Sequence, residues 1–168
     1  MERISKDEYY LNIAEKVSER STCLQKHWGA VIVKDDVIVS TGFNGAPRKV
    51  GDCMEDGYCN LQLARRKLQN TRRGTMYEQC MSVHAEQNAL LFADKDKLEG
   101  ATMYLVGKQI IDLDGKFQYV QEPAPCHICK KLIINAELEK VVVRLKEGHS
   151  ITYPVDGWLS KNEILGGY

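Results

Sequence analysis

The organisation of this chain follows from one stretch, Val83-His84-Ala85-Glu86-Gln87-Asn88-Ala89-Leu90-Leu91. Its partner further along the chain is Pro125-Cys126-His127-Ile128-Cys129. Imidazole and thiolate groups are donors that zinc prefers, and a site with three protein ligands leaves a fourth position for water. We therefore predict two helices whose first turns share one zinc ion, held by His84, Cys126 and Cys129. Glu86 is then the base that takes a proton from the water.

The spacing within each stretch supports this prediction. Cys126 and Cys129 are three residues apart, so both lie on one face of a helix. Pro125 suits a helix entry, where a missing N–H costs nothing. The exposed N–H groups at a helix start also lower the pKa of nearby thiols. Glu86 follows His84 by two residues, about 200° around the helix axis, so it can flank the water without binding the ion.

Each half of the pattern alone has a plainer interpretation. A Cys-x-x-Cys pair also occurs in redox proteins and in structural zinc sites. A lone buried histidine is often a hydrogen-bonded core residue. Together the halves match the His-x-Glu and Pro-Cys-x-x-Cys signature of zinc-dependent nucleobase deaminases. The alternative at this point is a purely structural zinc ion.

Size and charge limit the class of the protein. The 168 residues fit one domain with one core. The formal net charge is zero, so no global field draws the chain to nucleic acid or to a membrane. The first residues lack the apolar run of a signal peptide, and no stretch is long enough to span a bilayer. We expect a cytoplasmic protein, in which six cysteines favour metal ligation over disulfides.

Residue patterns place helices and strands along the chain. In order, we expect a helix over 7–18, strands over 29–33 and 37–41, helices over 61–68 and 85–93, a strand over 102–106, an extended hairpin at 108–122, a helix over 126–135, a strand over 141–145, and a tail over 151–168 with an edge strand and a short helix starting near Leu159. Ser5 and Glu8 predict a capping box for the first helix. This order predicts one α/β domain over 1–168, a three-layer α/β/α fold whose mixed five-stranded sheet carries helices on both faces.

Two other segments carry candidate functions. Gly42-Phe43-Asn44-Gly45-Ala46-Pro47 follows a strand, and its glycines let the backbone approach a ligand, so we expect a substrate loop rather than an ordinary turn. An irregular insertion at 48–82 contains a basic cluster. This cluster is either a solvated face or a contact for phosphate or another subunit, and comprises Arg65, Arg66, Lys67, Arg72 and Arg73.

From Ser21 to Arg144 the chain resembles the deoxycytidylate (dCMP) deaminases of the zinc-dependent cytidine and deoxycytidylate deaminase family. The resemblance rests on Ser21-Thr22-Cys23, Gly29-Ala30-Val31-Ile32-Val33, the Gly42 to Pro47 loop, Val83 to Ala89 and Pro125-Cys126-x-x-Cys129. It implies a cytidine deaminase-like fold and zinc-dependent hydrolysis of dCMP to dUMP and ammonia, which supplies dUMP for dTMP synthesis.

The resemblance also implies a role for each matching residue. Glu86 would shuttle a proton from water to the ring N3 and then to the leaving amine. Asn44 would hydrogen-bond the deoxyribose or the base, and the backbone of Ala85 would contact the pyrimidine. The sequence does not choose among the candidates for the substrate phosphate, which are Arg20, Lys26, Arg48 and Lys49.

Regulation and assembly are implied in the same way. Family members are commonly homo-oligomers, often hexamers, activated by dCTP and inhibited by dTTP with Mg²⁺ on the triphosphate. The matching positions here are Gly42, Phe43, Gly45, Ala46, Phe92 and Lys95. Phe43 replaces the usual tyrosine, and Lys95 stands where some members have arginine, which removes a planar fork for phosphate. The long 108–122 hairpin is absent from shorter members.

Four further cysteines, Cys23, Cys53, Cys59 and Cys80, lie in or near the irregular insertion. Some family members carry a second, structural zinc in this region, and Cys23 matches one of its positions. Four thiolates form a closed zinc site that would anchor a segment with few apolar residues. The alternative is that some of these cysteines are simply buried or surface thiols.

Three rival functions remain open. The chain could deaminate another cytosine nucleotide or nucleoside, although its neutral charge argues against a polynucleotide substrate. It could be an inert nucleotide-sensing module of the same fold, but a structural zinc site does not need Glu86. It could be a thiol–disulfide protein using Cys126 and Cys129, in which His84 and Glu86 have no role.

Overall fold

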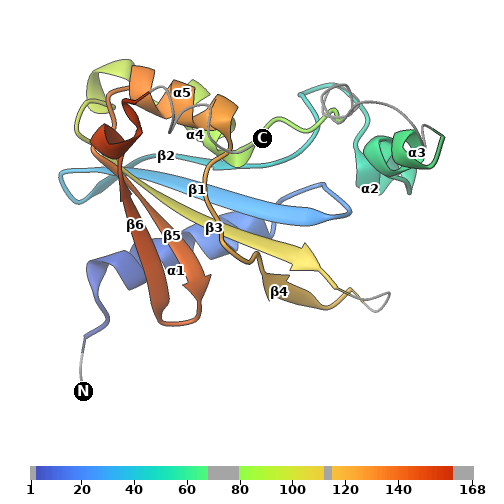
Figure 1. Ribbon diagram of the computed structural model, residues 1–168, viewed down its shortest axis with the longest axis horizontal. Helices are drawn as coiled ribbons and strands as arrows, with labels where there is room; N and C mark the ends of the chain where they lie inside the picture. Colours follow the sequence, from blue (N-terminus) through green and yellow to red (C-terminus); the bar gives the residue numbers. More distant parts are fainter. Residues whose placement is uncertain (1–2, 68–79, 112–114, 161–168) are drawn as a thin grey trace.

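The computed structural model describes residues 3–67, 80–111 and 115–160. A mixed sheet forms its centre, with strand order β2-β1-β3-β5-β6 and a sixth strand, β4, paired with β3 (Figure 1). The strands are β1 (Lys26–Lys34), β2 (Val37–Phe43), β3 (Thr102–Ile110), β4 (Phe117–Tyr119), β5 (Lys140–Lys146) and β6 (His149–Pro154). The expected mixed sheet with helices on both faces is confirmed, and β4 adds one strand to the expected five.

The pairing directions make the sheet mixed. β1 is antiparallel to both β2 and β3, whereas β3 and β5 run parallel. Asp35 and Asp36 join β1 to β2 with φ angles of 50° and 65°. This two-residue turn with two positive φ angles matches the right-handed twist of the strands.

Helix α1 (Lys6–Ser18) covers one face of the sheet. Its buried Tyr10, Leu11 and Ala14 belong to an apolar cluster with residues of β1, β3 and β5. The helix lies close to β1, because a Cβ at Gly29 would come 2.1 Å from the carbonyl oxygen of Ala14.

Of the two hydrogen bonds in the capping box expected for α1, one is present and the other is not. The Ser5 side chain accepts a hydrogen bond from the backbone N–H of Glu8, as expected. The Glu8 carboxylate, however, accepts a hydrogen bond from the buried Arg144 at 2.9 Å. A charged partner from β5 therefore takes the place of the backbone of Ser5.

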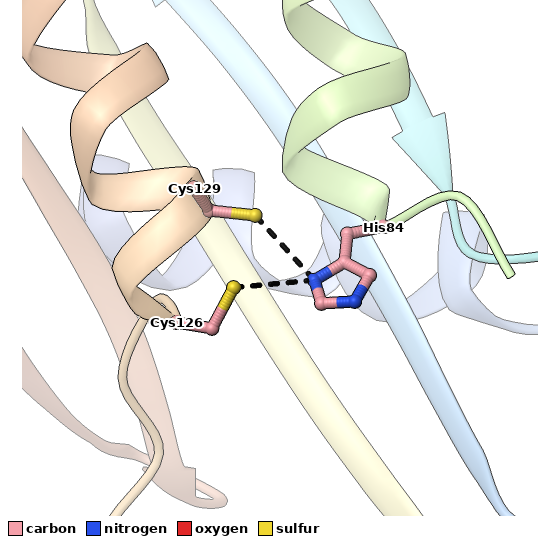
Figure 2. A group of neighbouring side chains, drawn as sticks. All are labelled: His84, Cys126 and Cys129. Carbon is pink, nitrogen blue, oxygen red and sulfur yellow. Dashed lines mark hydrogen bonds between the residues drawn. The ribbon is translucent and has the colours of Figure 1, made fainter. Parts of the chain in front are cut away.

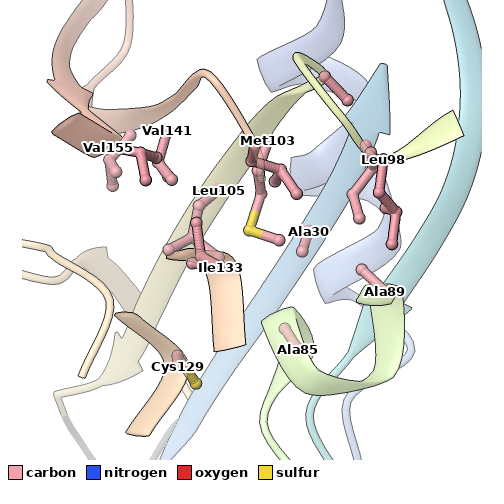
Figure 3. Packing of buried hydrophobic residues seen from close by; sticks show 14 of the residues in the cluster. Ala30, Ala85, Ala89, Leu98, Met103, Leu105, Cys129, Ile133, Val141 and Val155 are labelled. Atoms are coloured by element: carbon pink, nitrogen blue, oxygen red, sulfur yellow. The ribbon is translucent and has the colours of Figure 1, made fainter. Parts of the chain in front are cut away.

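Helices α4 (Ala85–Leu91) and α5 (His127–Asn135) cover the opposite face. Figure 3 shows Ala85, Ala89, Cys129 and Ile133 of these helices packed with Ala30, Met103 and Leu105 of the sheet. A Cβ at Gly42 would come 2.3 Å from the carbonyl oxygen of Ala85, so α4 sits directly on β2. The first turns of α4 and α5 consequently share one apolar core.

The insertion contains two short helices, α2 (Cys53–Asp56) and α3 (Asn60–Lys67), which lie beyond one end of the sheet (Figure 1). The Asp52 side chain caps α2 by accepting from the backbone of Met54 and Glu55. The side chains of the basic cluster at 65–73 lie outside the described residues.

The remaining elements are short. β4 pairs with the end of β3, with Ile110 opposite Phe117, and forms the extended hairpin. The 3-10 helix η2 (Lys95–Lys97) follows α4, and η3 (Val155–Trp158) follows β6. β6 is the edge strand expected in the tail. Leu159 is the C-cap of η3, and most of the helix expected to start near it lies outside the described residues. None of the helices in the described ranges combines the length and the apolar character needed to cross a bilayer.

Candidate active site

His84, Cys126 and Cys129 converge where α4 and α5 begin (Figure 2). The Nδ1 atom of His84 lies 3.5 Å from the Sγ atom of Cys126 and 3.5 Å from that of Cys129. The three potential ligand atoms all lie within 4.8 Å of one another. His84 and Cys126 are both N-cap residues with extended backbone, so each side chain leaves its helix at the first turn.

Neighbouring contacts fix the first turn of α4. The backbone N–H of His84 donates to the side-chain oxygen of Gln87 at 2.9 Å. The Asn88 amide donates to the carbonyl oxygen of Phe43 at 2.7 Å, which ties α4 to the end of β2. Gly45 and Val83 form a backbone bridge just before His84. The histidine is therefore held from the sheet side and from its own helix.

The donor set suits zinc. Two sulfurs and one imidazole nitrogen are soft or borderline ligands of the kind that zinc takes in three-ligand catalytic sites. The hydrogen bond from Cys129 lowers the pKa of Cys126 to about 4, with His84 adding to the effect against the opposing effect of burial. The same hydrogen bond, together with burial, raises the pKa of Cys129. The lowered pKa of Cys126 favours its thiolate, which is the form that binds a metal.

Glu86 lies within the same site. Its side chain is 5% exposed, and it lines a pocket together with His84, Ala85 and Cys126. Burial raises the pKa of Glu86, while its own backbone amide and the nearby His84 oppose the rise. A carboxyl group with a raised pKa is suited to accepting and returning a proton.

The pocket has a volume of about 340 Å³ and is open to solvent on one side. β1, the substrate loop, the insertion and the two metal helices all contribute to its walls. Its lining residues are Cys23, Gln25, Lys26, Trp28, Asn44, Cys59, Leu61, Gln62, Cys80, Ser82, His84, Ala85, Glu86, Ala124 and Cys126.

A family model described as the cytidine and deoxycytidylate deaminase zinc-binding region matches residues 4–145. The chain belongs to this family. It is 34% identical over 142 residues to the deoxycytidylate deaminase of Mycobacterium phage D29, with 84% of this chain and 96% of that protein covered. It is 29% identical over 143 residues to the deoxycytidylate deaminase of Saccharomyces cerevisiae, spanning 83% of this chain but only 38% of the yeast protein.

A solved relative has the same fold. The crystal structure of dCMP deaminase from the cyanophage S-TIM5, in complex with dCMP and dUMP, superposes with a TM-score of 0.51 at 25% identity. The match covers 84% of each chain. It supports the deaminase fold that the sequence resemblance implies.

Asn44 lines the pocket of this deaminase, but its side-chain amide already makes two hydrogen bonds to the backbone of β1. Its Oδ1 atom accepts from the backbone of Trp28 at 2.7 Å, and its Nδ2 atom donates to the carbonyl oxygen of Lys26 at 2.9 Å. A side-chain amide has two donor hydrogens and two acceptor lone pairs, so one of each remains for a ligand. Asn44 therefore shapes the pocket edge and also presents polar atoms to it.

Only one of the four residues predicted to bind the substrate phosphate lies at the pocket. Lys26 lines the pocket, whereas Arg20, Arg48 and Lys49 do not. The guanidinium of Arg48 instead lies 4.4 Å from the ring centre of Phe92, at the end of α4. Arg48 thus contacts a residue to which the family resemblance gives a regulatory role.

The residues expected to bind a regulatory nucleotide lie on two segments beside α4. Gly42 packs on the α4 backbone, and Phe43 accepts from Asn88. Gly45 bridges to Val83, and Ala46 follows it. Phe92 caps the end of α4, and Lys95 begins η2 with its side chain exposed. Of these six residues, Phe92 is the one that contacts a cation, the guanidinium of Arg48.

The four further cysteines lie near one another, where the insertion borders the pocket. Cys23, Cys59 and Cys80 line the pocket. Burial raises the pKa of Cys53, and Cys59, Cys23 and Cys80 raise it further through their charges. Within the described ranges, however, His84, Cys126 and Cys129 form the group of three ligands whose atoms approach within 4.8 Å.

Sequence reasoning missed Trp28, Gln25, Gln62 and Ser82 as pocket residues. Trp28 had a detectable signal, because it alternates with Ala30 and Ile32 on the sheet face that packs under the metal helices. The other three lie in loops or in the insertion, where no periodic pattern indicates a direction.

Proposed function

We propose that this protein catalyses the hydrolytic deamination of dCMP, in which dCMP and water give dUMP and ammonia. The observation that carries the proposal is Glu86, a buried carboxyl group that shares one pocket with His84 and Cys126. A structural zinc site does not need this carboxyl group. The names of the phage and yeast relatives support dCMP as the substrate.

The chain's own residues suit this reaction. Glu86 is placed to take a proton from water, to give it to the ring N3, and to pass a proton to the departing amine. Trp28 offers an aromatic face to the pyrimidine, and the backbone of Ala85 together with Asn44 offers polar atoms to the base or sugar. A zinc ion held by the imidazole and the two thiolates would act as a Lewis acid that lowers the pKa of water and supplies the nucleophile.

An ammonia-release assay across five substrates tests the choice of substrate. The substrates are dCMP, CMP, dCTP, deoxycytidine and cytidine. We expect dCMP to have the highest kcat/KM. A higher value for another member would transfer the proposal to that nucleotide or nucleoside, and no release from any of them would leave the inert sensing module as the better description.

We assign the substrate phosphate to Lys26, because it is the one of the four candidate cations that lines the pocket. Lys26→Ala should raise KM for dCMP about tenfold or more, since charge-assisted hydrogen bonds contribute about 1.5–3 kcal/mol. It should leave turnover of deoxycytidine unchanged. Lys49→Ala is the matched control on the neighbouring loop, and an equal effect of the two changes would reject the assignment.

A second zinc, held by Cys23, Cys53, Cys59 and Cys80, is a further part of the proposal. The proximity of these cysteines supports it, because three of them line one pocket and, besides burial, each of those three raises the pKa of the Cys53 thiol. Metal analysis of purified protein should give two zinc ions per chain and one in Cys53→Ser. One zinc per chain in both forms would reject the second site.

Assembly and regulation also belong to the proposal. Exposed apolar side chains on the two metal helices support a homo-oligomer, with a hexamer as the favoured form: Leu91, Phe92, Ile128 and Leu132. The same ammonia assay with dCTP or dTTP and Mg²⁺ tests regulation. Activation by dCTP and inhibition by dTTP are expected, and indifference to both would remove the regulatory role of the Phe92 and Lys95 region. Placement in the cytoplasm remains an expectation from the sequence.

A further inference from the structure

We infer that a polar cluster on the α1 face of the sheet, built around the buried side chain of Arg144, positions the loop that carries the ligand Cys126. Its other members are Glu8, Asn12, Glu15, Lys108 and Tyr119. The inference rests on the zinc site and not on the choice of substrate, so its outcome is separable from that of the proposed reaction. Tyr119 and Arg144 are positioning residues in this account, because neither touches the pocket.

Arg144 is the centre of the cluster. Its side chain is only 2% exposed, although it extends from β5 into the space beneath α1. Its guanidinium donates to Glu8, Asn12 and Glu15 at 2.9 Å each. A buried charge of this kind must keep its partners, because an unpaired one is strongly destabilising.

Glu15 connects the cluster to the hairpin. One of its carboxylate oxygens accepts from Arg144 and also from the hydroxyl of Tyr119, both at 2.9 Å. The other oxygen forms an ion pair with Lys108. Lys108 and Tyr119 are opposite each other in the β3–β4 pair, so a single carboxylate holds both strands of the hairpin.

The chain leads directly from Tyr119 to the zinc site. The backbone N–H of Val120 donates to the carbonyl oxygen of Gly107 at 3.0 Å, which continues the strand pairing by one residue. The Tyr153 hydroxyl donates to the carbonyl oxygen of Pro123 at 3.2 Å. Cys126 then begins α5. The ligand is therefore separated by only a few residues from a strand whose last side chain is held by Glu15.

The geometry offers a matched control. Tyr104 on β3 also donates its hydroxyl to a carboxylate of α1, that of Asp7, at 2.9 Å. It thus makes the same type of bond, of the same length, between the sheet and the same helix. Its strand does not run into the loop that carries Cys126.

The experiment compares zinc release in Tyr119→Phe, Tyr104→Phe and the parent protein. Zinc-loaded protein is mixed with a colorimetric chelator, and the rate of zinc release is recorded. The kinetic phase that is missing in His84→Ala is assigned to the zinc held by His84, Cys126 and Cys129. We expect zinc release from Tyr119→Phe to be at least about threefold faster than from Tyr104→Phe. Each variant loses one hydrogen bond to a carboxylate, but only the bond of Tyr119 holds the strand that leads to Cys126. Rates within threefold of each other would overturn the inference.

Amide hydrogen exchange provides a second readout that does not require zinc. In Tyr119→Phe, exchange of the Val120 N–H should be faster than in the parent, while in Tyr104→Phe it should be unchanged. Unchanged exchange at Val120 in Tyr119→Phe would show that the hydroxyl does not hold the hairpin, and this result would also contradict the inference.

Discussion

Glu15 accepts hydrogen bonds from side chains on three different strands, Lys108, Tyr119 and Arg144. Burial tends to raise the pKa of Glu15, but the hydrogen bonds from Lys108 and Tyr119 and the charges of Lys108 and Arg144 outweigh it. The pKa of this carboxyl group therefore lies below its ordinary value of 4.5. A carboxyl group with a lowered pKa stabilises the folded state above its unfolded pKa, and this contribution is lost as the pH falls through the folded pKa.

Glu15→Gln should remove this pH-dependent contribution. At neutral pH the variant should lose about 1–3 kcal/mol of unfolding free energy, because hydrogen bonds to a charged acceptor are weakened. The difference between parent and variant should shrink as the pH falls below 4.5, the ordinary pKa of the carboxyl group. Urea unfolding at several pH values measures the difference.

Glu19→Gln is the control, because Glu19 lies just after the same helix and pairs with Lys16 in an exposed ion pair. Such pairs contribute at most about 1 kcal/mol. A parent–variant difference for Glu15→Gln that stays constant from neutral to acidic pH would contradict the role given to this carboxylate.

Residues with specific chemistry were predictable from the sequence, and residues that depend on long-range contacts were not. His84, Cys126 and Cys129 could be identified because few side chains bind zinc and their spacing restricts the geometry. The position of Lys26 at the pocket, which the other three candidate cations lack, depends on the path of β1 and could not be predicted from the sequence. The pairing of Glu8 with Arg144 joins residues 136 positions apart, which no local pattern reveals.

At the scale of elements, Gly107 of β3 determines where Trp28 lies. The two residues are opposite each other in the β1–β3 pair. A Cβ at Gly107 would come 2.5 Å from ring atoms of Trp28, so the indole lies across the place where another residue would have its side chain. The absence of a side chain on β3 thus gives the pocket its aromatic wall.

Gly107→Ala should displace Trp28 and weaken substrate binding. We expect kcat/KM for dCMP to fall about tenfold or more, because stacking of a base on an aromatic ring contributes about 1–3 kcal/mol. Zinc content should not change. Gly157→Ala is the control, since no atom lies within 4 Å of its Cβ position. Steady-state kinetics with unchanged constants for Gly107→Ala would show that Trp28 does not contact the substrate.

The element boundaries show where local patterns stop being informative. The apolar run of β3 ends at Val106, and the sequence predicts a strand over 102–106 followed by a separate extended hairpin at 108–122. The strand continues to Ile110 because Lys108, Gln109 and Ile110 pair with β4. The hairpin was predictable, because Asp114-Gly115 is a strong turn dipeptide between two strand-like segments. Asp114 itself lies outside the described residues. Pairing between strands, rather than residue preference, sets the remaining length.

At the scale of the whole molecule, α4 and α5 carry large apolar side chains that are exposed to solvent. Leu91 at the end of α4 is 72% exposed, and Ile128 on α5 is 55% exposed. A contiguous patch of exposed apolar side chains indicates a protein contact, and we expect Leu91 and Ile128 to belong to such a patch. A second copy of the chain is the partner that the proposed homo-oligomer places there.

Ile128→Glu should reduce the size of the assembly without unfolding the chain. A charged group buried in an interface without a partner is strongly unfavourable. Light scattering on a size-exclusion column should show the parent at several times the monomer mass and the variant at a lower mass. Ile151→Glu, on the edge strand β6, is the control. A parent that elutes as a monomer would contradict the expected assembly.

The most direct measurement is the conversion of dCMP to dUMP and ammonia by the parent and by Glu86→Gln, with zinc content and circular dichroism recorded for both. We expect one ammonia per dUMP from the parent. We expect the variant to keep its fold and its zinc while kcat falls about 10²–10⁴-fold, the range typical of a lost general acid–base group. Turnover by a folded, zinc-containing Glu86→Gln close to that of the parent would contradict this expectation.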